Sequence, residues 1–162
     1  MTSRRRFLAA FGTGMVGLAG CLSGPGPREA ADPWLERTVT EDETDNGTPV
    51  EHVTGRVKLT RGEFTTYEFG HPEEVMFIDF RGDTVLSLPF DVATVRQSAL
   101  TTFAEGEEID FFSTASSFET TGTRFHSRLQ AGEYAIVLDN SRMWGARPLD
   151  EVEIRFELAV EY

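Results

Sequence analysis

The sequence predicts an all-β fold, a single antiparallel β-sandwich that is jelly-roll-like and carries one short helix. Segment 151–162 alternates strictly between apolar and mostly charged side chains, which is the pattern of a strand with one buried and one solvent-exposed face. Segment 132–138 is nearly all apolar, which indicates a central strand covered on both faces. Short strand-like runs recur between turn residues from Val50 onward, a spacing typical of sandwiches and small barrels.

The other strands follow from apolar runs and the turns between them. We expect strands over 53–60, 64–69, 74–81, 84–88 and 90–95. Gly62, Gly70 and the Gly82–Asp83 pair supply turns. Pro89 interrupts the sheet, because proline has no N–H for a ladder hydrogen bond.

One helix is predicted over 99–105. Ser98 is placed to cap its first turn, and Gly106 to end it in a left-handed conformation. Leu100 and Phe103 are three residues apart and would share the buried face.

Residues 1–20 resemble a twin-arginine export signal, with Arg4 and Arg5 as the arginine pair. The apolar run that follows, 7–19, is too short to span a membrane as a helix, which needs roughly 20 apolar residues. Small residues then precede Cys21, as in a lipobox, and Cys21 is the only cysteine in the chain. We therefore expect lipid attachment at Cys21. A plain secretory signal with a chance cysteine is the alternative.

The predicted organisation is a signal peptide over 1–20, a lipid-anchored flexible acidic linker over 21–49, and a β-sandwich over 50–162. The linker is rich in Pro, Gly and acids, which cannot bury apolar surface. Trp34, Leu35 and Val39 interrupt it, and they either add an edge strand or dock loosely on the domain. Asn46 begins an Asn-Gly-Thr glycosylation sequon.

The chain is strongly acidic, with a formal net charge of −12. Loss of residues 1–20 would remove three of the 15 basic residues and none of the 27 acidic ones, which gives a side-chain charge of −15. Lys58 is the only lysine. This composition is typical of extreme halophiles, with an acidic face for a basic partner as the alternative. Nucleic-acid binding is excluded, because it requires a basic footprint.

We predict that the domain swells or unfolds below roughly 1 M salt, where the Debye length grows beyond about 3 Å and the acidic residues repel one another. Circular dichroism should show a falling melting temperature on dialysis into dilute buffer. A melting temperature that holds steady would contradict the prediction.

No catalytic, cofactor or metal site is predicted. A lipid-modified Cys21 leaves no thiolate for blue copper or for structural zinc. His52, His71 and His126 lack metal-ligand spacing, and they are read as unrelated surface histidines. The acidic turns around 79–83 and 139–140 offer oxygen ligands for Ca²⁺ as an alternative.

Trp144 lies in the predicted loop before the last strand, with Arg142 and Arg147 beside it. An aromatic ring next to arginines on the rim of a sandwich suits contact with a sugar or a protein. The alternative is that Trp144 plugs the edge of the core.

Residues 129–141 read L-Q-A-G-E-Y-A-I-V-L-D-N-S. They resemble the L-P-A-G-x-Y-x-x-V-x-D-N segment of pre-peptidase C-terminal and GOLD-like β-sandwich modules, except at Gln130, where that segment has proline. Residues 103–116 are similar to a segment of uncharacterised twin-arginine-exported lipoproteins of halophilic archaea. The resemblance implies a tight turn at Gly132, a packed Tyr134 and a non-catalytic accessory or binding role.

The function expected from these features is that of a lipoprotein on the extracytoplasmic face of the cell membrane. It would act as a non-catalytic module that binds an envelope protein or glycan. Two alternatives stay open. One is a small hydrolytic enzyme built on His126 and carboxylates, and the other is a structural subunit of an envelope complex, marked by a large exposed apolar patch.

Overall fold

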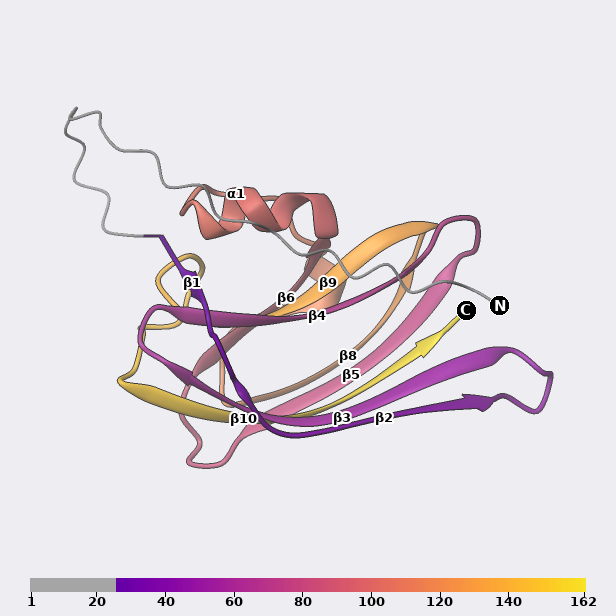
Figure 1. The fold of residues 1–162 in the computed structure, drawn as a ribbon, viewed down its shortest axis with the longest axis horizontal. Coiled ribbons are helices and arrows are strands. Elements are labelled where there is room, and N and C mark those ends of the chain that lie inside the picture. The colour runs from indigo at the N-terminus through magenta and orange to yellow at the C-terminus, as the bar shows by residue number, and fades with distance from the viewer. Residues whose placement is uncertain (1–25) are drawn as a thin grey trace.

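The computed structural model describes residues 26–162, so Arg4, Arg5 and Cys21 lie outside the described residues. Two five-stranded sheets pack face to face as a sandwich (Figure 1). The first sheet has the order β1-β4-β9-β6-β7, and the second has the order β2-β3-β10-β5-β8. The strands are β1 Arg28–Glu29, β2 Trp34–Glu43, β3 Pro49–Thr60, β4 Glu63–His71, β5 Met76–Thr84, β6 Phe90–Arg96, β7 Ser116–Thr120, β8 Gly122–Leu129, β9 Gly132–Asn140 and β10 Glu151–Glu161.

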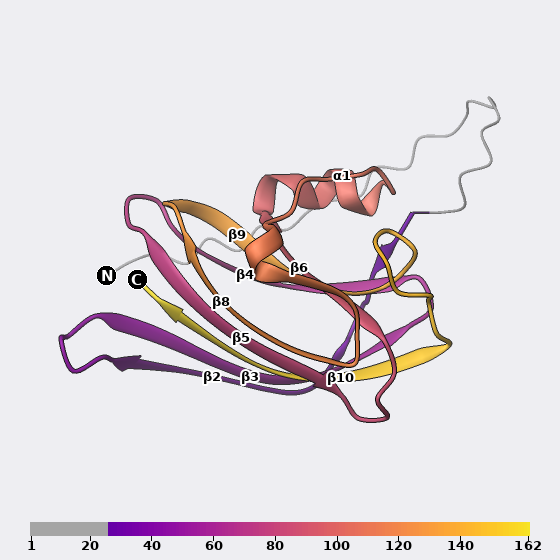
Figure 2. The same cartoon turned by 180° about the vertical axis from the view of Figure 1, so that it is seen from behind.

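The strand pairing is that of a long hairpin folded over on itself. Four antiparallel pairs nest inside one another, β6 with β7, β5 with β8, β4 with β9 and β3 with β10. The pairs of β5 with β10 and of β6 with β9 then close the two sheets, which curve around the core in Figure 2. This is the jelly-roll arrangement, so the predicted fold class is confirmed.

The two strands with the clearest sequence patterns are buried as predicted. In β10, the even-numbered side chains from Val152 to Val160 enter the core, and their neighbours face outward. In β9, Tyr134, Ile136 and Leu138 belong to the core between the sheets. The alternate residues of β9 belong to a second apolar cluster, which includes Phe103 of helix α1 (Leu100–Ala104). Helix α1 lies across the first sheet (Figure 1), which explains why β9 is apolar on both faces.

Three local predictions are wrong. Gly70 supplies no turn, because β4 continues through it to His71. Segment 84–88 is not a strand, because β5 continues through Gly82 and Asp83 to Thr84 and the turn comes later, with Ser87 at φ 53°. Gly82 is needed inside the strand, since an added Cβ there would lie 2.9 Å from the Phe80 ring. Ser98 caps no helix. It lies in the 3₁₀ turn Gln97–Ala99, and the residue before α1 is Ala99.

Other features of these segments match their predictions. Gly106 ends the helix with φ 81°, and Gly132 turns into β9 with φ 146°. Tyr134 is fully buried, and its hydroxyl donates to the Gln130 carbonyl over 2.7 Å.

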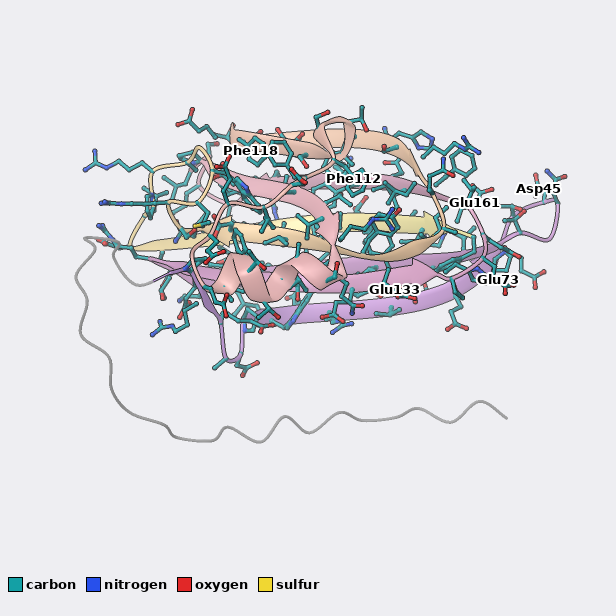
Figure 3. All side chains as sticks on the ribbon, turned by 90° about the horizontal axis from the view of Figure 1, so that it is seen from above. Asp45, Glu73, Phe112, Phe118, Glu133 and Glu161 are labelled. Atoms are coloured by element: carbon teal, nitrogen blue, oxygen red, sulfur yellow. The ribbon has the colours of Figure 1, made fainter. Side chains whose placement is uncertain are left out.

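The predicted linker over 21–49 requires a correction, because the folded domain begins before Val50. Residues 34–43 form edge strand β2, which pairs antiparallel with β3. The strand forms because Trp34 packs on Phe156, with ring centroids 5.7 Å apart, and Val39 pairs with the buried Val53. Of the two alternatives for Trp34 and Val39, the edge strand is the one observed. Asn46 lies exposed in the β2–β3 turn, next to Asp45 at the hairpin tip in Figure 3.

Within residues 26–162, no helix has both the length and the apolar character needed to cross a membrane.

Candidate functional site

Two buried carboxylates lie beneath the loop that joins β9 to β10. Asp91 of β6 and Asp139 of β9 are direct cross-strand partners, and both are 0% exposed. Buried acids are rare unless they are paired or hydrogen-bonded. Their position under residues 141–149, called here the rim loop, makes this loop the candidate site.

Asp91 anchors the rim loop through backbone hydrogen bonds. Its carboxylate accepts the N–H of Gly145 over 2.9 Å and that of Ala146 over 2.8 Å. It also accepts the N–H of Glu119 in β7 over 2.7 Å. One side chain therefore ties the loop to two strands of the first sheet.

The close approach of the loop to β7 depends on Gly145. A Cβ at this position would lie 3.0 Å from Glu119 Cγ and 3.2 Å from Phe118 Cβ. These distances are shorter than ordinary van der Waals contact. A larger residue would require the loop or these β7 side chains to shift by a few tenths of an ångström.

Asp139 has fewer partners than Asp91. Its Oδ2 accepts the Ser141 hydroxyl over 2.8 Å, whereas its Oδ1 is buried without a hydrogen-bond partner in the described part of the chain. Burial, and after it the charge of Asp91, raises the pKa of Asp139 to about 7, even though the Ser141 hydrogen bond acts in the opposite direction. The two carboxylates thus share a buried site, in which a second negative charge is unfavourable.

Two further side chains fix the ends of the rim loop. The Asn140 amide donates to the carbonyls of Leu59 and Leu149, and its oxygen accepts the N–H of Leu149 over 2.9 Å. The Ser141 hydroxyl accepts the N–H of Met143 over 3.2 Å. With Asp91 holding its middle, the loop is fixed along its length.

Trp144 packs into an aromatic cluster over the outer face of the first sheet. Its ring stacks on Phe103 with centroids 4.7 Å apart, and Phe118 lies 5.5 Å away. Phe111 meets Phe118 edge-on and is 41% exposed. The ring of Trp144 is half-buried and covers the second apolar cluster, as the plug alternative describes.

Arg142 and Arg147 stand on either side of this plug. Both are exposed, and neither forms an ion pair with any residue from 26 to 162. In Figure 3, the acidic residues Asp45, Glu73 and Glu161 gather near the β2–β3 hairpin tip, and Phe118 lies in the other half of the sandwich. The rim loop thus carries two exposed cations on either side of the half-buried Trp144 ring.

The structure places two of the three histidines near one carboxylate, that of Asp79. His126 Nδ1 lies 4.0 Å from Asp79 Oδ2, which is longer than a hydrogen bond. Asp79 instead accepts two hydrogen bonds from Arg124. His52, His126 and Asp79 line one shallow groove, whereas His71 accepts the N–H of Glu74 in a turn.

The part of the chain that the structure describes contains no cluster of three or more His, Cys, Asp or Glu residues able to hold a metal ion. The acidic segments considered for Ca²⁺ are engaged elsewhere. Asp83 pairs with Arg155 over 2.6 Å, and Asp139 is buried beside Asp91.

Among residues 26–162, the exposed large apolar side chains are spread over several parts of the fold. Leu35 and Val39 are on β2, Phe77 is on β5, Val85 and Leu86 follow β5, and Phe111 follows α1.

Among solved structures, the chain is similar to the pre-peptidase C-terminal domain of a collagenase from Bacillus anthracis. The sequence identity is 8% and the TM-score is 0.36, over 85% of this chain and 97% of that chain. No family model matches the chain. No curated protein matches it either. At this TM-score the fold assignment depends on the strands and their pairing, which define a jelly-roll β-sandwich with a buried carboxylate pair beneath one loop.

Proposed function

We propose that this chain is a non-catalytic binding module, tethered by a lipid on Cys21 to the extracytoplasmic face of the membrane. The observation that supports binding at the rim loop is the set of hydrogen bonds that fix its backbone beside two exposed arginines. Asp91, Asn140 and Ser141 bind the loop backbone, while Arg142 and Arg147 are exposed and pair with no acid of residues 26–162. A rigid loop loses little conformational entropy on binding.

The chemistry of the rim loop suits an envelope protein or glycan that carries negative charge. Arginine forks match carboxylate, sulfate or phosphate groups with two parallel hydrogen bonds. The exposed face of Phe111 adds apolar area beside them. The fold presents this loop on a stable scaffold, an arrangement typical of binding surfaces.

The test replaces Arg142 and Arg147 together with alanine. We expect the stability of the domain to change by less than about 0.5 kcal/mol, because both side chains are exposed. Capture of a partner from envelope fractions should fall about tenfold, in salt at which the chain is folded. Protease digestion of the envelope before capture distinguishes a protein partner from a glycan.

The matched control is the double variant Arg81→Ala, Arg128→Ala. It removes two exposed arginines from the second sheet that also lack an ion pair within the described chain. It should capture the partner as the wild type does. Equal capture by the rim-loop variant and the wild type would remove the rim loop from the proposal.

A further inference from the structure

Among residues 26–162, no strand pairs with the outer edge of β2. β2 is ten residues long and ends the strand order of the second sheet, so it pairs with β3 on one side only. Leu35 and Val39 are 45% and 41% exposed on it. An exposed edge of this length is a template for another strand.

The hydrogen bonds of β3 show which groups of β2 are free. Pro49 accepts the N–H of Tyr162, so the odd-numbered residues of β3 bond toward β10. Lys58 donates to Pro33, so the even-numbered residues bond toward β2. Thr38 and Thr40 lie opposite even-numbered residues of β3 and therefore point their backbone groups at β3.

The alternate residues of β2, Arg37, Val39 and Glu41, consequently direct their N–H and C=O groups to the free edge. Their side chains also share one face, because Val39 lies opposite the buried Val53. The Arg37 guanidinium lies 4.8 Å from the centre of the Trp34 ring on this face. Along the free edge, the residues that offer backbone hydrogen bonds are therefore a cation (Arg37), an apolar residue (Val39) and an anion (Glu41).

We propose that β2 pairs antiparallel with β2 of a second copy of this chain, with Val39 opposite Val39 of the second copy on a two-fold axis. In this register Arg37 of each copy lies opposite Glu41 of the other, so two opposite-charge pairs flank an apolar contact. An axis at Arg37 or at Glu41 would instead place like charges opposite each other.

On the other face of the strand, the same register sets Glu36 opposite Asp42 of the second copy. Arg56 lies 3.5 Å from Glu36 and reduces this repulsion. The interface is therefore self-complementary, and it is separate from the rim loop.

Cysteine cross-linking of the full chain in intact cells, with a copper–phenanthroline oxidant, tests the register. Val39→Cys should give a disulfide-linked dimer, because hydrogen-bonded partners have Cα atoms about 5.5 Å apart. The matched control is Thr38→Cys, whose two copies would be about 8 Å apart and should stay monomeric. The wild type, with Cys21 alone, measures any background.

Charge reversal in the Val39→Cys background tests the ion pairs. Arg37→Glu or Glu41→Arg alone should lower the cross-linked fraction severalfold, because each creates two like-charge pairs. The double variant should restore it. A monomeric Val39→Cys chain, equal cross-linking at Thr38→Cys, or indifference to the single reversals would overturn the proposal.

Discussion

Replacing Asp91 by alanine should destabilise the folded domain by about 3–5 kcal/mol and release the rim loop. The variant removes the acceptor of three N–H groups, the buried one of Ala146 and the part-buried ones of Glu119 and Gly145. Each hydrogen bond to a charged group contributes roughly 1.5–3 kcal/mol, and a buried unsatisfied donor carries its full desolvation cost. Loss of negative charge beside Asp139 offsets only part of this.

Urea denaturation gives the change in unfolding free energy, and amide hydrogen exchange at Gly145 and Ala146 reports release of the loop. Asp91→Asn keeps one acceptor oxygen and should recover part of the loss. Asp110→Ala, at an exposed position, is the control and should change stability by less than about 0.5 kcal/mol. If Asp91→Ala unfolds at the same denaturant concentration as that control, Asp91 does not hold the loop.

The strands that the sequence predicted best are those in which burial follows one simple rule. β10 is buried on one face, and its apolar and polar residues alternate. β9 is buried on both faces, and its residues 134–138 are apolar in an unbroken run. Neither rule applies to β7 and β8, which are the edge strands of their sheets. In β8 only Phe125 and Leu129 supply large apolar groups to the inner face, so segment 116–129 has no continuous pattern.

Edge strand β2 was predicted only as one of two alternatives, for a related reason. Most of its side chains are exposed, so the selection for apolar residues that marks a central strand is weak. The Gly82–Asp83 pair shows the opposite error, in which turn-forming residues lie inside a strand. Glycine is required there by the Phe80 ring, a contact between residues on one strand that no turn propensity reflects.

The candidate site was predicted in part. The positions of Arg142, Trp144 and Arg147 in one loop followed from the strands on either side. The role of Asp91 did not, because Asp139 is its neighbour only through the register of β6 with β9. A lone acid in the apolar run 90–95 was the available signal, since an ionised side chain enters such a run only with partners.

The buried pair also makes stability depend on pH through Asp139. In the folded chain Asp139 keeps its proton up to about pH 7, whereas a free Asp releases it near 3.8. Between these values the folded state binds the extra proton, so the unfolding free energy contributed by this group falls as pH rises. The loss is complete above about pH 7 and amounts to roughly 4 kcal/mol for the pKa difference.

Asp139→Asn should therefore be more stable than the wild type by about 2–4 kcal/mol at pH 8 and nearly equal to it below pH 4. The Asn oxygen can still accept the Ser141 hydroxyl, and the uncharged amide replaces the protonated acid opposite Asp91 in the strand pair. Urea denaturation from pH 4 to 8 gives the unfolding free energy of both proteins. The difference between the two curves is the contribution of Asp139, because all other acids are common to both proteins.

Asp91→Asn gives an independent check, because it removes the neighbouring charge that helps to raise the Asp139 pKa. The pH at which the Asp139 contribution levels off should then move below 7. Curves of wild type and Asp139→Asn that run parallel across this range would show that Asp139 is ionised in the fold throughout. The unpartnered Oδ1 would then have to be satisfied by a group other than a proton.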